Sequence, residues 1–138
     1  MRILVIDAQG GGIGRQLVAA IKEQIPGAMV TAVGTNSAAT AAMLKAGADR
    51  AATGENAVIV NSRKADAVVG PIGIVIADAL LGEITPAMAA AVAQCSAKRV
   101  LIPVSHCDNI VVGVGETNYS RLIQEAVDEL RKGIDRTC

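Results

Sequence analysis

The sequence predicts a three-layer α/β sandwich, in which helices cover both faces of a mostly parallel sheet. Apolar strand-like runs alternate with helical patterns along the chain, and this order is typical of parallel strands joined by crossover helices. Residues 2–6 form a continuous apolar run, as expected for a strand buried on both faces. The chain has 138 residues, of which 51% are hydrophobic, so we expect one domain over residues 1–138 with a modest core.

The first half of the chain contains three predicted strands, each followed by a helix. Glycines and then apolar residues at helical spacing follow the first strand, and Pro26-Gly27 ends that helix. Asn36 or Ser37 is placed to cap the next, Ala-rich helix. The predicted strands are residues 2–6, 28–34 and 48–52, and the predicted helices are residues 13–25, 37–47 and 55–64.

The second half continues this alternation but ends differently. Thr85 is placed to cap a helix that has Pro86 at its first position. Residues 105–108 are too few for a crossover between the last two strands, so these strands should pair as a C-terminal antiparallel hairpin. The predicted strands are residues 65–70, 99–104 and 109–114, and the predicted helices are residues 73–82, 86–95 and 118–133.

Composition narrows the class of protein. The 13 basic and 13 acidic residues balance and no basic stretch occurs, which argues against a nucleic-acid partner. No apolar stretch is long and helical enough to span a membrane, and we expect no membrane partner. The three cysteines form no CxxC pair and no secretory signal is present, so we expect a reducing cytoplasm. So small a domain leaves little room for a separate substrate region, which favours a homo-oligomer.

The stretch IDAQGGGIG, residues 6–14, suggests a phosphate-binding turn. Glycines that follow a strand and open a helix are typical of dinucleotide-binding folds. The spacing is irregular, however: GxGxxG needs glycine where Arg15 stands, and GxxxGxG needs glycine where Ala8 stands. The alternative is a turn that serves the fold alone. The predicted ligand-binding residues of the turn are Asp7, Gln9, Gly10, Gly11, Gly12, Ile13 and Gly14.

The end of the second strand is where a carboxylate binds the ribose hydroxyls of NAD in such folds. Residues 34–37 read GTNS and contain no carboxylate. Thr35, Asn36 and Ser37 can donate hydrogen bonds to a phosphate, so NADP or another phosphorylated nucleotide fits better than NAD. The alternative role for these residues is a helix cap, and a cap can serve both purposes.

Other loops follow strands and should meet at the same edge of the sheet, where open α/β sheets bind ligands. Each also has a plain role as a turn or a helix cap, so their predicted convergence is the argument for function. Residues 105–109 form one such loop. The remaining predicted ligand-binding residues are Gly54, Glu55, Asn56, Gly70, Pro71 and Gly73.

Five polar side chains have alternative roles. Asp7 can accept from a ribose or hold the glycine turn through backbone N–H groups, and Asp78 needs a partner in its apolar stretch. His106 and Cys107 are residue types that can form a nucleophile or a metal site, but adjacent strand residues point to opposite faces and no zinc-type spacing accompanies them, which favours a hairpin turn. Tyr119 has Ile four residues later, where the short-chain dehydrogenases place Lys, so their hydride chemistry is not supported. No residue is assigned a catalytic role and no metal site is predicted.

Several stretches of the sequence share a pattern with one family. These stretches are Gly10–Gly14, Gly34–Thr40, Gly54–Ala57, Gly70–Met88 and Cys107–Gly113. Together they resemble an uncharacterised family of short bacterial proteins that is common among anaerobes, a domain of unknown function. The resemblance implies a Rossmann-like fold and a bacterial cytoplasmic protein, and it implies no substrate or reaction. It also implies that glycine is usual where Ala8 stands, which would restore GxxxGxG.

Three hypotheses for function follow. The first is a small Rossmann-like protein that binds a nucleotide or dinucleotide, with an NADP-like ligand favoured. The second is a non-catalytic oligomeric regulatory or scaffold subunit, in which the glycine turn is structural. The third is an enzyme that uses Cys107 and His106.

Overall fold

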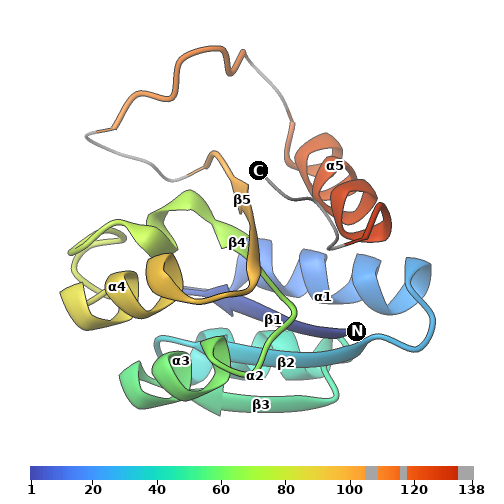
Figure 1. The fold of residues 1–138 in the computed structure, drawn as a ribbon, viewed down its shortest axis with the longest axis horizontal. Helices are drawn as coiled ribbons and strands as arrows, with labels where there is room; N and C mark the ends of the chain where they lie inside the picture. Colours follow the sequence, from blue (N-terminus) through green and yellow to red (C-terminus); the bar gives the residue numbers. More distant parts are fainter. Residues whose placement is uncertain (105–108, 116–117, 134–138) are drawn as a thin grey trace.

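A computed structural model describes residues 1–104, 109–115 and 118–133. It confirms the three-layer α/β sandwich, with a five-stranded sheet between two layers of helices (Figure 1). The strands are β1 (Arg2–Asp7), β2 (Met29–Gly34), β3 (Arg50–Thr53), β4 (Ala67–Pro71) and β5 (Lys98–Ile102). The helices are α1 (Gly12–Gln24), α2 (Ser37–Lys45), α3 (Glu55–Ser62), α4 (Pro86–Gln94) and α5 (Tyr119–Arg131), with a short 3₁₀ helix η1 (Ile72–Val75).

The sheet has the strand order β3-β2-β1-β4-β5, and every neighbouring pair is parallel. The chain moves outward in one direction from β1 to β3 and then crosses back to β4, so the order reverses between β1 and β4. Open α/β sheets bind ligands outside the carboxyl ends of the strands at such a reversal. Asp7 lies opposite Gly34, which lies opposite Thr53, so the ends of β1, β2 and β3 are level.

Two hydrophobic clusters hold the layers together. Ile3 and Val5 of β1 face the cluster under α1, α2 and α5, and Leu4 and Ile6 face the cluster under α3 and α4. All four side chains are at most 1% exposed, which explains why residues 2–6 show no polar alternation. Burial of one such side chain contributes about 2 kcal/mol. Among the described residues, no helix is long and apolar enough to cross a membrane.

The helix predicted over residues 73–82 is wrong. Only η1 is helical in this stretch, and the chain then turns over the sheet edge before α4 begins at Pro86. Asp78, Leu80 and Leu81 have φ values of 65°, 57° and 57°, which a right-handed helix excludes. Asp78 is also exposed to solvent, so the apolar surroundings predicted for it are wrong.

The predicted C-terminal antiparallel hairpin is not formed. Residues 109–115 contain no strand, and within the described chain β5 pairs only with β4. Two local features oppose the hairpin: Pro103, just after β5, has no N–H to donate to a ladder, and Gly113 has a φ of 89°. The connecting residues 105–108 lie outside the described residues.

Candidate functional site

A crevice lies at the reversal of strand order, between the end of β1 and the end of β4. Its volume is about 170 Å³. The lining comes from the glycine turn, from the end of β4, from the loop after η1 and from the start of α5. The lining residues are Asp7, Ala8, Gln9, Gly10, Gly12, Ile13, Gln16, Pro71, Leu80 and Tyr119.

Asp7 lines the crevice and holds the glycine turn through hydrogen bonds to the backbone. Its Oδ1 accepts from the N–H of Ala8 at 2.8 Å, and its Oδ2 accepts from the N–H of Gly14 at 2.6 Å. These are the hydrogen bonds that the holding role of Asp7 requires. Burial raises the pKa of Asp7, and the N–H groups of Gly14, Ala8 and Ile13 oppose the rise without cancelling it. A buried carboxyl with a shifted pKa beside a crevice is typical of functional sites.

Gly11 and Gly14 are needed by the fold itself. Gly11 has a φ of 73°, and a Cβ there would lie 3.0 Å from the backbone of Ala39. A Cβ on Gly14 would lie 2.5 Å from Sδ of Met43 and 2.8 Å from Cβ of Asp7. These two glycines let α1 approach β1 and α2 closely, so they have structural reasons to be glycine.

Gly10 and Gly12 are different, because the described residues give no reason for glycine there. Neither has a positive φ, and a Cβ at either position would meet no atom of the described residues within 4 Å. Both line the crevice, and Gly12 is the first residue of α1. At these positions the backbone is open to the close approach of a ligand, and the N-terminus of the helix favours a negative charge.

A second polar cluster lies at the end of β2 and centres on Glu83, which the sequence analysis missed. Oε1 of Glu83 accepts from Oγ1 of Thr35 at 2.6 Å, from Nδ2 of Asn36 at 2.7 Å and from the N–H of Gln9 at 3.0 Å. Nδ2 of Asn36 also donates to the carbonyl of Gln9 at 2.9 Å. Burial acts to raise the pKa of Glu83, but the donors Thr35, Gln9 and Asn36 outweigh it and lower the pKa.

Asn36 and Gln9 also stabilise the local backbone conformation. Asn36 caps α2, since its Oδ1 accepts from the N–H of Ala39 at 2.9 Å, whereas Ser37 is the exposed first residue of that helix. Gln9 has a φ of 52°, and its N–H and its carbonyl are both hydrogen-bonded within the Glu83 cluster. The structure therefore brings Thr35, Asn36 and Gln9 together, as predicted. They surround the carboxylate of Glu83, which was not predicted to belong to the site.

The other predicted site residues lie at the same edge but outside the lining of the crevice, except for Pro71. Glu55 begins α3, beside Asn56, and accepts from Oγ1 of Thr85 at 2.5 Å. Gly54 precedes α3 with a φ of 103°. A Cβ on Gly70 would clash with the carbonyl of Ile6, and one on Gly73 would lie 3.1 Å from Leu80. The packing of strand and loop explains these last two glycines.

Tyr119 and Leu80 line the crevice although they lie far from the glycine turn in the sequence. Tyr119 begins α5, which packs beside α1, and its side chain is 51% exposed. Leu80 belongs to the loop after η1 and is buried. The apolar character of residues 74–81 gave a signal for burial, but no pattern in the sequence indicated which strand ends these residues would approach.

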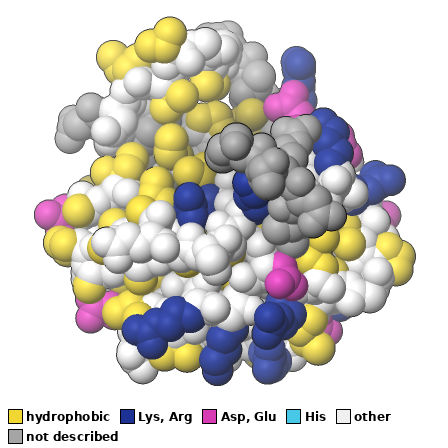
Figure 2. All heavy atoms as spheres, viewed as in Figure 1, with side chains coloured by type: hydrophobic (Ala, Val, Ile, Leu, Met, Phe, Trp, Pro, Cys, Tyr) yellow, Lys and Arg dark blue, Asp and Glu magenta, His cyan; other side chains and the backbone are white. Residues whose placement is uncertain are grey.

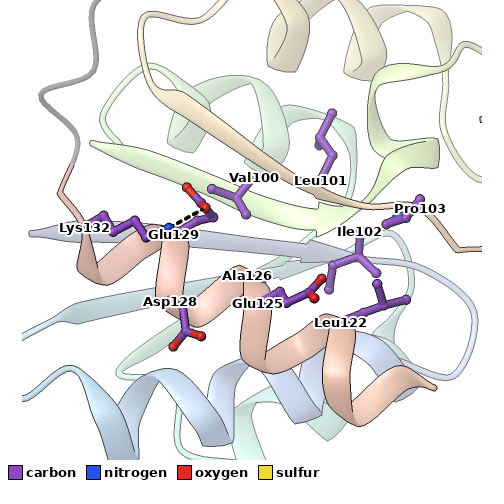
Figure 3. Close-up of a pocket in the computed structure, with 10 residues that line it drawn as sticks. All are labelled: Val100, Leu101, Ile102, Pro103, Leu122, Glu125, Ala126, Asp128, Glu129 and Lys132. Atoms are coloured by element: carbon purple, nitrogen blue, oxygen red, sulfur yellow. Dashed lines mark hydrogen bonds and ion pairs between the residues drawn. The ribbon is translucent and has the colours of Figure 1, made fainter. Parts of the chain in front are cut away.

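A larger cavity, of about 420 Å³, lies between β5 and α5 and is called the β5–α5 groove here. Figure 3 shows Ile102 and Leu122 at one end of it, and Lys132 joined to Glu129 at the other. Among the described residues, three carboxylates of α5 border the groove, those of Glu125, Asp128 and Glu129, and one lysine, Lys132, borders it. This charge balance disfavours a phosphorylated ligand, so we retain the crevice as the candidate site despite its smaller volume.

Some predictions stay untested. His106 and Cys107 lie outside the described residues. Within the described chain, no group of three or more His, Cys, Asp or Glu residues could hold a metal ion. The cytoplasmic location and the exclusion of nucleic acid also stay predictions.

Comparisons with known proteins identify the family and support the fold. A family model described as a domain of unknown function, DUF3842, matches residues 2–135 and confirms the resemblance to such a family. No curated protein matches. One similar solved structure is a dodecameric FMN-dependent UbiX-like decarboxylase from Escherichia coli O157:H7. It is 18% identical, with a TM-score of 0.54 and 95% of each chain covered, and this likeness concerns the fold alone.

Proposed function

This chain belongs to the DUF3842 family, and we propose that it binds a nucleotide-type cofactor in the crevice between β1 and β4. Gly10 and Gly12 carry the proposal. Both line the crevice, and neither the backbone conformation nor any atom of the part of the chain that the structure describes requires glycine there. A ligand that approaches the backbone closely, as a phosphate does at the start of a helix, gives a physical reason for glycine at both positions.

The size of the crevice limits how much of the ligand it encloses. Its volume of about 170 Å³ is smaller than the roughly 300 Å³ at which ligand pockets begin. One ring or one phosphate therefore lies inside, and the rest of the ligand extends over the glycine turn toward the end of β2. The similar solved structure is described as FMN-dependent, and FMN is a nucleotide-type cofactor, which agrees with this class of ligand.

The preference for NADP is not retained. It depended on the absence of a carboxylate from residues 34–37, because a carboxylate there would repel a 2′-phosphate. Glu83 brings a carboxylate to Thr35 and Asn36, so the premise no longer holds.

Calorimetric titration of the protein with FMN, NAD, NADP and AMP tests the proposal. We expect at least one of these ligands to bind, and we expect Gly12→Val to weaken that binding roughly tenfold or more, because the new side chain fills ligand space. Ala19→Val, on an exposed position of the same helix, is the matched control and should bind like the wild type. Absence of binding to all four at millimolar concentration, or full binding by Gly12→Val, would refute the proposal.

We also infer that the chain self-associates. The projecting segment, residues 109–115, extends away from the sheet (Figure 1), and hydrophobic side chains gather on this part of the surface (Figure 2). Ile110 and Val112 are each 91% exposed, which is costly in water unless another surface covers them. The β5–α5 groove offers apolar side chains beside an edge strand, and a second copy of the projecting segment is its inferred occupant. The similar solved structure is described as dodecameric, which agrees with assembly.

A further inference from the structure

Glu83 occupies a position that has a known use in nucleotide-binding sheets. Folds of this kind place an acidic side chain at the end of the second strand, where it accepts hydrogen bonds from the ribose hydroxyls. In this chain β2 ends at Gly34, and the next residues contain no acid. The carboxylate that reaches this point belongs to the loop between η1 and α4, 48 residues after Thr35.

We propose that Glu83 forms a subsite for the vicinal hydroxyls of a ribose, so that the nucleotide site accepts a ribose with a free 2′-hydroxyl and rejects one with a 2′-phosphate. The subsite rests on the proposed nucleotide site, because it recognises the part of the ligand that extends beyond the crevice. Gln9 connects the two places: it lines the crevice, and its N–H donates to Glu83.

The hydrogen-bond geometry supports a carboxylate that is held in place yet able to accept more. The donors Thr35, Asn36 and Gln9 all bind Oε1 of Glu83, at 2.6, 2.7 and 3.0 Å. They fix the direction of the carboxylate, and since no hydrogen bond from the described residues reaches Oε2, its lone pairs can accept from a ligand hydroxyl. Thr35 and Asn36 are positioning residues in this arrangement, and Asn36 is itself fixed because it caps α2.

The charge of Glu83 sets the selectivity. Its three donors lower its pKa, so the side chain is ionised at neutral pH. An ionised carboxylate accepts strongly from hydroxyl groups and repels a phosphate at the same place. A 2′-deoxyribose lacks one of the two hydroxyl donors, and a 2′-phosphate both replaces that donor and adds a like charge, so both changes should weaken binding.

Three matched probes test the subsite by calorimetry: AMP, 2′-deoxy-AMP and adenosine 2′,5′-bisphosphate. We expect AMP to bind roughly tenfold or more tightly than either of the others. In Glu83→Gln we expect AMP to bind more weakly and the discrimination against the bisphosphate to shrink. Glu23→Gln, an exposed position on α1, should leave all three affinities unchanged. Urea unfolding of both variants shows whether each is folded.

The outcomes separate this inference from the proposed function. Equal binding of the three probes, or binding of FMN without binding of AMP, would overturn the ribose subsite and leave the nucleotide site standing. Tighter AMP binding by a folded Glu83→Gln would also overturn it, because Glu83 would then block the edge. If neither the three probes nor FMN, NAD or NADP binds at millimolar concentration, both proposals fail.

Discussion

Asp7 shows how one buried side chain determines the shape of the glycine turn. Its two oxygens accept from the N–H groups of Ala8 and Gly14, which lie on either side of the turn. The helix α1 has no side-chain cap from Gly11, so Asp7 binds a backbone donor at the start of the helix that a capping residue would otherwise satisfy. Hydrogen bonds within the protein therefore hold both ends of the turn.

Replacement of Asp7 by Asn should destabilise the protein. An amide has one acceptor oxygen and presents N–H donors, so one backbone N–H at the turn loses its partner. We expect Asp7→Asn to lower the free energy of unfolding by about 1–3 kcal/mol, measured by urea denaturation. Asp78→Asn, at an exposed position, should change it by no more than about 0.5 kcal/mol. Equal effects of the two substitutions would contradict the holding role of Asp7.

Two glycines of the same turn should respond in opposite directions. A Cβ on Gly14 would crowd Met43 and Asp7, so Gly14→Ala should cost about 1–3 kcal/mol of stability. Gly12 is helical and its Cβ would meet nothing, so Gly12→Ala should stabilise the protein by about 0.4–1 kcal/mol. Thermal unfolding of the two variants measures both effects. Destabilisation by Gly12→Ala would mean that the fold itself requires glycine there.

At the residue scale, local pattern predicted the glycine turn and the polar residues after β2, because each lies within a few positions of a strand end. Glu83 and Tyr119 could not be found in this way. Glu83 reaches Thr35 and Asn36 only because the loop after η1 folds over the sheet edge, and Tyr119 reaches the crevice only because α5 packs beside α1. Such contacts depend on the order of the strands, which one sequence does not reveal.

The loop between η1 and α4 is the element that departs most from its predicted structure. Ile74 of η1 and Leu80 and Ile84 of the loop itself are buried, and this explains the apolar run that suggested a helix. Leu80 and Leu81 adopt left-handed backbone conformations, which cost a residue with a Cβ about 1 kcal/mol each. The apolar run therefore indicated the burial of Ile74 and Leu80 correctly, but it indicated neither the exposure of Leu81 nor the loop conformation.

The strained conformation of Leu81 gives a test of this loop. Leu81 has a φ of 57° and is 91% exposed, so its side chain adds little packing. Because Asn tolerates the left-handed region, we expect Leu81→Asn to raise the free energy of unfolding by about 0.5 kcal/mol. The matched substitution Leu44→Asn, on an exposed position of α2, should lower it because Asn is a poor helix former. A loss of stability in both variants would contradict the loop conformation.

For the whole molecule, the alternation of strands and helices predicted the α/β sandwich, and the parallel sheet followed from the crossover helices. The C-terminal hairpin was predicted wrongly from the β-branched residues 110–112, because a β-branched run forms a strand only where a partner strand is available. In this chain those residues project from the sheet, and Ile110 and Val112 are almost fully exposed. The same apolar pattern at residues 110–112 is therefore also compatible with the proposed contact between two copies of the chain.

Introducing negative charges into the projecting segment should dissociate the proposed oligomer. We expect the wild type to elute as an oligomer in size-exclusion chromatography with light scattering, and the double variant Ile110→Asp, Val112→Asp to have a smaller molar mass, because burial of the new charges is unfavourable. Leu81→Asp is the control, since Leu81 is equally exposed but lies in another loop. A monomeric wild type, or a double variant of unchanged mass, would contradict self-association through this segment.

The most direct test of the nucleotide site is the response of individual backbone amides to a ligand. In a ¹⁵N-labelled protein titrated with AMP and, separately, with FMN, we expect the largest chemical-shift changes at the amides of Gly10 and Gly12, which line the crevice. The amides of Ile102, Leu122 and Ala126 border the β5–α5 groove and should shift little. Changes centred on the groove, or no change with either ligand at millimolar concentration, would contradict it.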